Sequence, residues 1–411
     1  MKKFIYFFPV VIMILFIVSC NTNTVTDNNV NDNPNLTVSE QKLVQSGNAF
    51  GLKIFREINN TEGNKNIFIS PLSISMALGM TYNGANGTTL DGMHTTLEYG
   101  DLTLDEINQA YKNVIDLLYS LDPEVVMQLA NSLWASQYLT FIPEFIQRNQ
   151  DYFYAKVENV DFGDPATTDI INNWVNNATN EKIQRIFDEP LDPQTAMVLI
   201  NAIYFKGTWT HRFDASLTHQ DIFRIADGSQ VSCIMMTTTD SLDYYENDLF
   251  QAVDLPYGNE DYNMTIFLPK TGKTVDDVIN NISDQNLQLW IDSFEKTEVD
   301  LSMPKFKLEY EITLNDVLSS LGMSIAFTTA ADFTNMYTPG DLFISLVKHK
   351  SFVEVNEEGT EAAAVTAVVI ELTAILNQIM RVDHSFFFVI RENVTQSILF
   401  MGKIVQPTWS E

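Results

Sequence analysis

The side chains that could carry out catalysis do not fall into a known catalytic arrangement. The histidines are His94, His211, His219, His349 and His384, with neither metal-ligand spacing nor an accompanying cysteine pair. No nucleophile elbow, zinc-hydrolase motif or phosphate-binding glycine loop occurs. Because the chain holds 53 Asp and Glu residues, neighbouring carboxylates arise by chance and none stands out as an acid–base pair. We therefore expect no enzyme, no metal and no cofactor.

One segment has a composition unlike the rest of the chain. Residues 359–376 read GTEAAAVTAVVIELTAIL, where the charges are Glu361 and Glu371 and no proline or aromatic occurs. With a period of two, one face has small residues first and larger ones later, so such a strand could enter between two existing strands with little displacement. That face consists of Thr360, Ala362, Ala364, Thr366, Val368 and Ile370. Gly359 provides a permissive pivot at its start.

A buried helix is an equal alternative for the same segment when periodicity alone is considered, because Ala and Leu favour helices. The rest of the chain has to decide between the two.

The elements around this segment are mixed. Helical periodicity and capping signals predict helices over 38–59, 73–83 (capped near Ser70 and opened by Pro71), 172–183 and 313–322. Runs rich in β-formers predict strands over 198–205, 264–268, 298–303, 343–347 and 351–355, with a closing hairpin over 386–390 and 397–405. Because the pattern lacks a regular strand–helix alternation, the fold class is α+β.

Composition excludes several classes of partner. The formal net charge is −29, from 24 Lys and Arg against 53 Asp and Glu. Without a basic patch the chain should bind neither nucleic acid nor anionic lipid headgroups. Hydrophobic residues make up 45% of the chain, which is enough for a large globular core.

The N-terminus predicts export. Lys2 and Lys3 precede a 15-residue apolar stretch that is too short for a membrane span and has the form of a signal peptide. The segment ends at Ser19-Cys20 and is similar to the cleavage site of bacterial lipoproteins, which implies lipidation of Cys20. An ordinary signal peptide is the alternative. Residues 20–37 are rich in Asn and Thr and are expected to form a flexible tether, while Cys233 has apolar neighbours and is expected to be buried.

The segment Glu357-Glu358-Gly359-Thr360-Glu361-Ala362-Ala363-Ala364 resembles the hinge of inhibitory serpins almost residue for residue. The resemblance extends over about 38–411. Its other motifs lie at 66–74, 84–89, 201–209, 213–214, 304–306, 318–323, 386–390 and 402–404. It implies one domain over 38–411, with three β-sheets, eight or nine helices and an exposed reactive-centre loop over about 359–380.

The family's mechanism is suicide inhibition. A protease attacks the loop as a substrate and forms an acyl-enzyme, and the cut loop then inserts as a strand and distorts the protease. Thr360, Ala362, Ala364 and Thr366 would face the sheet interior on insertion. Their small size favours an inhibitory member, and a non-inhibitory serpin acting as a binding module is the alternative.

The position of the scissile bond can be counted from either side of the reactive-centre loop, and the two counts differ by one residue. Counting from Glu357 gives Thr373-Ala374, which we favour, and counting back from Ser385-Phe386 gives Ala374-Ile375. Either bond places a small uncharged residue before the cut, which suits elastase-like or subtilisin-like serine proteases better than trypsin-like ones. A cysteine protease is the other class of target. We expect a monomer that meets membranes only through the lipid anchor.

Two further clusters follow from the resemblance. Ser70, Ser73, Asn201 and His349 are similar to the family's shutter, a polar cluster beneath the strands that must part. Lys305 and Glu357 match positions that commonly pair at the breach, where insertion begins, and Trp209 would pack beside them.

Overall fold

The computed structural model of the chain describes Met1, residues 36–360 and residues 377–409. Residues Asn35–Glu411 cluster as one unit, in which helices and strands mix as an α+β fold requires. The helices are α1 (Val38–Glu62), α2 (Pro71–Tyr82), α3 (Gly87–Thr96), α4 (Leu104–Ser120), α5 (Pro143–Phe153), α6 (Ala166–Ala178), α7 (Val275–Asn281), α8 (Asp284–Ile291) and α9 (Asn315–Leu318).

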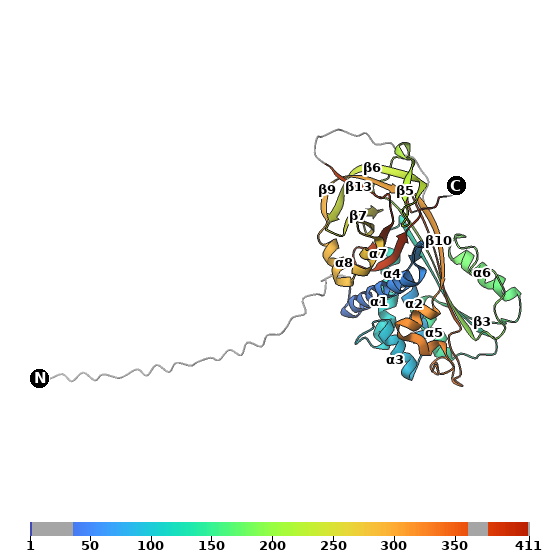
Figure 1. Cartoon of the computed structure of the whole chain (residues 1–411). Coiled ribbons are helices and arrows are strands. Elements are labelled where there is room, and N and C mark those ends of the chain that lie inside the picture. The colour runs from blue at the N-terminus through green and yellow to red at the C-terminus, as the bar shows by residue number, and fades with distance from the viewer. Residues whose placement is uncertain (2–35, 361–376, 410–411) are drawn as a thin grey trace. The chain divides into compact units, whose positions relative to one another are not determined.

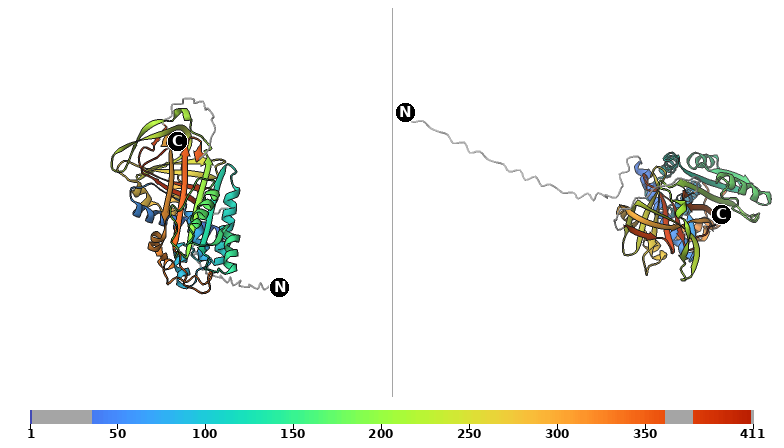
Figure 2. Two further views of the ribbon diagram at one scale, coloured as in Figure 1. Left: turned by 90° about the vertical axis from the view of Figure 1, so that its right-hand side faces the viewer. Right: turned by 90° about the horizontal axis from the view of Figure 1, so that it is seen from above.

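A six-stranded sheet has the order β10-β11-β12-β4-β2-β3. Its strands are β2 (Val125–Ser136), β3 (Lys156–Val160), β4 (Met197–Thr208), β10 (Phe306–Thr313), β11 (Leu346–Asn356) and β12 (Gly359–Thr360). The long strands β4 and β11 run in parallel, while short β12 is antiparallel to both. Figure 2 shows the long strands of this sheet side by side.

A nine-stranded sheet has the order β1-β15-β14-β8-β7-β6-β9-β13, with β5 also paired to β6. Its strands are β1 (Ile67–Ile69), β5 (His219–Arg224), β6 (Gln230–Glu246), β7 (Phe250–Tyr257), β8 (Tyr262–Pro269), β9 (Glu295–Pro304), β13 (Gln378–Arg381), β14 (Phe386–Glu392) and β15 (Ile398–Ile404). The long strand β6 pairs with β5 and β9 along most of its length and with β7 at its end. Through these pairings β6 makes one nine-stranded sheet out of strands that would otherwise form two. The described residues therefore form two sheets, where the resemblance implies three.

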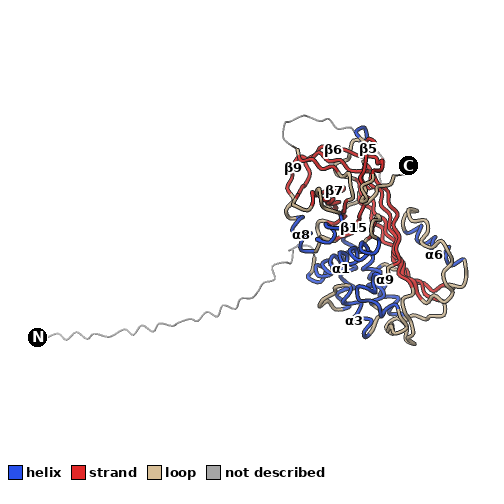
Figure 3. Tube along the Cα trace, in the orientation of Figure 1, coloured by secondary structure: helices blue, strands red, loops and turns tan. Residues whose placement is uncertain are grey.

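Helices cover both faces of the six-stranded sheet. Figure 1 and Figure 3 show α6 on one face and the group of α1 to α5 on the other. Trp134, Ile171 and Val175 belong to a small core between α6 and the sheet, whereas the main core lies under α1 and α2 and extends into the nine-stranded sheet. The six-stranded sheet is therefore buried on both faces where it meets these helices.

Local signals account for α2 and the hairpin. Ser70 is the N-cap, its hydroxyl accepts from Ser73 N–H, and Pro71 occupies the first turn. The predicted helices over 38–59 and 73–83 correspond to α1 and α2, and the predicted hairpin corresponds to β14 and β15. These predictions are confirmed.

Four predicted elements, two strands and two helices, need correction. Residues 343–347 and 351–355 do not form two strands, because Leu346–Asn356 is continuous; its polar middle, Lys348 to Lys350, is held by ion pairs and by contacts of His349. The helix over 172–183 is shifted to Ala166–Ala178, since Asn180 and Glu181 adopt positive φ.

The helix over 313–322 is the fourth of these elements. It is split into α9, a π-turn at Ser319–Met323 and a 3₁₀ turn, with Gly322 at φ 118°. Thr313 still belongs to β10, where it pairs with Lys348, so the helix cannot begin there.

Candidate functional site

The first residues of the predicted hinge already lie inside the six-stranded sheet. Gly359 and Thr360 form β12 between β11 and β4, where Thr360 pairs with Val355 on one side and with Gly207 on the other. Thr360 is fully buried, and its hydroxyl lies 2.8 Å from the hydroxyl of Tyr257. We call the boundary between β4 and β11 the seam. The short strand β12 occupies the end of the seam where β4 finishes, at Gly207 and Thr208.

Glycine is required at the point where the chain enters the seam. Gly359 has φ 145°, and a Cβ there would lie 2.1 Å from the carbonyl oxygen of Gly207 and 2.7 Å from Thr208 Cα. Both obstacles are backbone atoms of β4 and cannot rotate away. Only glycine therefore fits at position 359, at the start of the hinge.

The predicted breach residues surround the turn before Gly359. Lys305 Nζ lies 2.8 Å from Glu357 Oε2, and Thr218 donates to the same carboxylate at 2.8 Å. Burial raises the pKa of Glu357, but the hydrogen bonds from Lys305 and Thr218 outweigh burial and hold this pKa below its ordinary value. Lys305 Nζ also lies 4.2 Å from the ring centroid of Trp409. The carboxylate therefore stays charged while partly buried.

Trp209 holds the backbone of the same turn. Its amide donates to Glu358 O at 2.8 Å, and its indole Nε1 donates to Asn356 O at 2.9 Å. Its ring stacks on Tyr257 at 4.4 Å. Tyr257 thus joins Trp209 to Thr360, a connection that the sequence did not reveal because Tyr257 carries no motif.

The predicted shutter residues come together below β12, where β4 and β11 pair directly. His349 Nδ1 lies 2.6 Å from Asn201 Oδ1, and His349 Nε2 accepts from Ser70 N–H at 3.3 Å. Because Nε2 accepts, the ring proton belongs on Nδ1 and is donated to Asn201. Asn201 in turn donates to Ser73 and, at 2.7 Å, to Asn131 Oδ1. The network links α2 to both strands of the seam.

Burial lowers the pKa of His349 to about 3 from its ordinary value of 6.5. The folded protein therefore holds a neutral ring, whereas the unfolded chain takes up a proton below pH 6.5. Stability contributed by the neutral ring is present above pH 6.5 and is lost as the pH falls from 6.5 toward 3.

Replacing His349 with Gln is expected to make the melting temperature less dependent on pH between 6.5 and 4. The variant should be less stable than the wild type at pH 7.5, and the difference should shrink in acid. Scanning calorimetry across this range measures the effect, and His211→Gln at an exposed position is the matched control. Parallel pH profiles for wild type and His349→Gln would contradict the assignment.

Several predicted residues lie outside the described part of the chain. These are Cys20, Ala362, Ala364, Thr366, Thr373 and Ala374. Within the described residues no group of three or more His, Cys, Asp or Glu side chains could hold a metal ion, and no helix has the length and apolar character to cross a membrane. Cys233 is buried, as expected, and burial raises its pKa to about 11.

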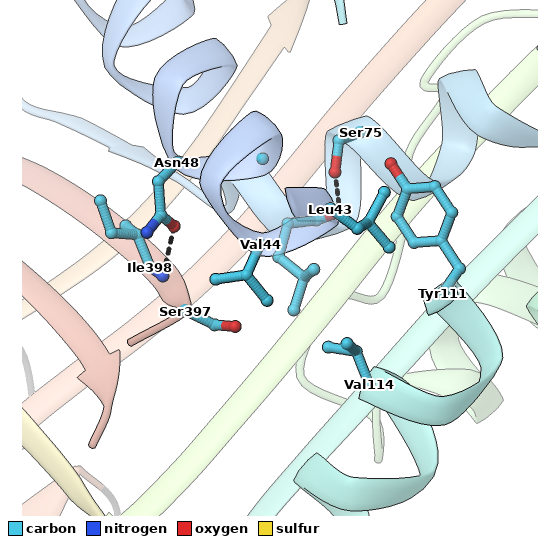
Figure 4. Close-up of a pocket in the computed structure, with 10 residues that line it drawn as sticks. Leu43, Val44, Asn48, Ser75, Tyr111, Val114, Ser397 and Ile398 are labelled. Atoms are coloured by element: carbon cyan, nitrogen blue, oxygen red, sulfur yellow. Dashed lines mark hydrogen bonds between the residues drawn. The ribbon is translucent and has the colours of Figure 1, made fainter. Parts of the chain in front are cut away.

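A pocket lies apart from the seam, between α1, α2, α4 and the start of β15 (Figure 4). Leu43, Val44 and Val114 make its wall largely apolar. Asn48 Oδ1 accepts from Ile398 N–H, and Ser75 donates to Leu72 O. These two polar groups are therefore satisfied within the protein.

The family model described as Serpin (serine protease inhibitor) matches residues 45–407. Iripin-5 of Ixodes ricinus is 36% identical over 373 residues, which cover 89% of this chain and 95% of the relative. Neuroserpin of Homo sapiens is 34% identical over 367 residues, covering 87% and 90%.

Solved structures agree with the sequence comparison. The thermophilic serpin tengpin in its native state aligns with a TM-score of 0.82 and 32% identity, covering 89% of this chain and 94% of the other. Human thyroxine-binding globulin aligns with a TM-score of 0.84 and 30% identity, covering 90% and 100%.

Proposed function

The chain belongs to the serpin family, and from this premise we propose that it is a suicide inhibitor of serine endopeptidases. The observation that carries the proposal is the position of Thr360, which lies buried between β4 and β11. The strand that would insert after cleavage has its first residues already paired on both sides. Cleavage then needs only to release the remainder of the segment for pairing to continue down the seam.

In the proposed cleavage reaction the protease supplies the catalytic groups. Its serine oxygen attacks the carbonyl of the residue before the scissile bond, the peptide C–N bond breaks, and the new amine leaves with the proton that the protease histidine delivers. The acyl-enzyme ester remains attached to the upstream part of the segment. Insertion of this upstream part into the seam, as a continuation of β12, moves the ester away from the breach before water can hydrolyse it.

The residue before the cut sets the class of target. With Thr373-Ala374 as the scissile bond, and Ala374-Ile375 as the alternative, the protease must accept a small uncharged side chain. We therefore propose an elastase-like or subtilisin-like protease, with a cysteine protease as the other class of target. We propose no enzymatic activity and no cofactor for the inhibitor itself.

The site of action is proposed from the N-terminus. Residues 1–19 would direct export, Cys20 would carry a lipid anchor, and residues 20–37 would tether a monomeric domain over 38–411 at the cell surface or outside the cell. A domain on such a tether could meet proteases in the surrounding medium.

A non-inhibitory binding module is the second candidate. The likeness to thyroxine-binding globulin, which by its name binds thyroxine, favours it. The small residues of the hinge, Thr360 with Ala362 and Ala364, favour the inhibitor because they suit insertion.

Inhibition of a panel of proteases tests the proposal. The full chain is mixed with elastase, subtilisin or trypsin, and the residual activity of each protease is measured. We expect loss of elastase or subtilisin activity near equimolar inhibitor and little loss of trypsin activity. Sequencing the released peptide identifies the scissile bond. Cleavage of the segment by all three enzymes without loss of activity would favour the binding module.

A further inference from the structure

A short segment that follows β15 lies against the edge of the six-stranded sheet that β10 forms. We call this segment, residues 405–409, the strap. Lys307 N–H of β10 donates to Thr408 O at 2.8 Å, and the Thr408 hydroxyl donates to Lys307 O at 2.9 Å. The strap therefore continues the hydrogen bonding beyond β10, which pairs with β11 on its other side.

The side chain of Asn66 fixes the beginning of the strap. Its Oδ1 accepts from Val405 N–H at 2.8 Å and from Gln406 N–H at 3.0 Å, while its Nδ2 donates to Gln406 O at 2.7 Å. Pro407, the next residue, is buried, and its ring restricts the backbone further. The path of the strap is therefore defined before it reaches Trp409.

The ring of Trp409 covers the ammonium group of Lys305. Lys305 Nζ lies 4.2 Å from the centroid of this ring and 2.8 Å from Glu357 Oε2. A cation over an indole face at this distance is attracted by the ring. The side chains of Lys305 and Glu357 are only 15% and 13% exposed, so salt screens their attraction less than it would on an open surface. Trp409 is therefore part of what encloses this ion pair.

The ion pair holds the turn that sets the register of the hinge. Asn356 pairs with Gly359, so Glu357 and Glu358 form a two-residue loop between β11 and β12. The length of such a loop fixes which residues of the two strands face each other. A shift by one residue would turn Thr360 to the opposite face of the sheet. Because the same shift would apply to every residue that pairs after Thr360, the turn governs how the reactive segment enters the seam.

We propose that Trp409 is a positioning residue for the hinge: its ring keeps Lys305 on Glu357, and this pair keeps the turn in register. The inference rests on the proposed function, because it concerns the same insertion. Trp409 acts on the hinge through Lys305. Loss of the ring opens the ion pair to water and salt, so the turn loosens and Thr360 leaves the seam more often before cleavage.

Hydrogen exchange of the uncut full-length protein tests the proposal. The variants are Trp409→Ala, Trp409→Leu and Trp409→Phe. Gln406→Ala is the matched control, because it changes an exposed side chain of the same strap.

Exchange is followed in two peptides, one containing residues 209–213 and one containing residues 356–360. The N–H groups of Trp209 and Phe213 donate to the two carbonyl groups of the turn, at 2.8 and 2.9 Å. Both peptides therefore report opening of the turn, one from each side of these hydrogen bonds.

We expect Trp409→Ala to exchange about fivefold faster than wild type in both peptides. Trp409→Phe should stay close to wild type because it keeps an aromatic face over Lys305. Trp409→Leu should lie between these two variants, because it covers the pair without that face. Raising the salt from about 0.01 M to about 1 M shortens the screening length from about 30 to about 3 Å. This change should speed exchange in Trp409→Ala and leave wild type and Gln406→Ala unchanged.

Lys305→Met separates action through Lys305 from a general loosening of the strap. With the ammonium group absent, Trp409→Ala should add little to the exchange rate of Lys305→Met. Exchange of Trp409→Ala at the wild-type rate would overturn the proposal. An increase that Trp409→Phe shares equally, or that is as large in the Lys305→Met background, would also overturn it.

The number of inhibitor molecules consumed for each protease molecule inhibited connects the turn to the proposed function. We expect this ratio to rise about threefold in Trp409→Ala. If exchange responds as expected but the ratio does not change, Trp409 holds the turn without serving inhibition, and the positioning role is wrong. If wild type inhibits no protease while exchange responds as expected, the proposed function is wrong and the hold of Trp409 on the turn is supported.

Discussion

Thr360→Arg is expected to convert the inhibitor into a substrate. Thr360 is fully buried between β4 and β11, with its hydroxyl at Tyr257, so an arginine there would have to bury a guanidinium without a counter-charge. Burying an unpaired charge costs several kcal/mol. Insertion should slow, and the protease should hydrolyse the acyl-enzyme before it is trapped.

The measurement is the number of inhibitor molecules consumed for each protease molecule inhibited. We expect this ratio to rise at least about tenfold, which corresponds to about 1.4 kcal/mol in the partition between trapping and release. The rate of cleavage should change little, since the proposed scissile bond lies far along the segment from Thr360. Thr360→Ser, which keeps the hydroxyl, is the control. An unchanged ratio for Thr360→Arg would mean that the burial of residue 360 between β4 and β11 is not needed for inhibition.

Cutting the reactive segment is expected to raise the melting temperature by roughly tens of degrees. In the uncut protein β4 and β11 pair directly below β12, from Val198 with Leu346 to Tyr204 with Phe352. An inserted strand would exchange this parallel contact for antiparallel pairing on both sides and would bury small and aliphatic side chains. The cut form should therefore be the more stable one.

A metalloprotease is suitable for this experiment because it forms no acyl-enzyme and leaves no complex. Differential scanning calorimetry before and after cleavage gives the shift. The cut Thr360→Arg variant should show a smaller rise than the cut wild type. A melting temperature unchanged by cleavage would mean that the segment does not insert.

Local and family signals predicted different parts of the molecule. Capping at Ser70 and the run of β-forming residues at the start of Phe386–Glu392 act over a few residues, so α2 and β14 could be placed from the sequence. The prediction of two separate strands in place of β11 was wrong. Ion pairs of Lys348 and Lys350 with β10 stabilise a polar stretch that looks, in the sequence, like a break between strands. Such contacts depend on a partner strand and are not visible in the local pattern.

The contacts of the site also fall into those that the sequence could predict and those that it could not. The pairing of Lys305 with Glu357 and the grouping of His349 with Asn201 could be expected from the family resemblance, since motif positions carry them. The contact of Tyr257 with Thr360 joins residues 103 positions apart. The contact of Lys305 with Trp409 joins the breach to the segment after β15. Tyr257 and Trp409 lie outside the motifs, so only the folded structure brings these partners together.

If cleavage leads to a trapped acyl-enzyme, denaturing electrophoresis should reveal a covalent complex of protease and inhibitor. The full chain is incubated with elastase, and in parallel with subtilisin, before boiling in detergent. We expect a band with the combined mass of protease and inhibitor, and this band should disappear when the protease serine is blocked beforehand. Complete cleavage of the chain by both enzymes, with no band above the free inhibitor, would contradict it.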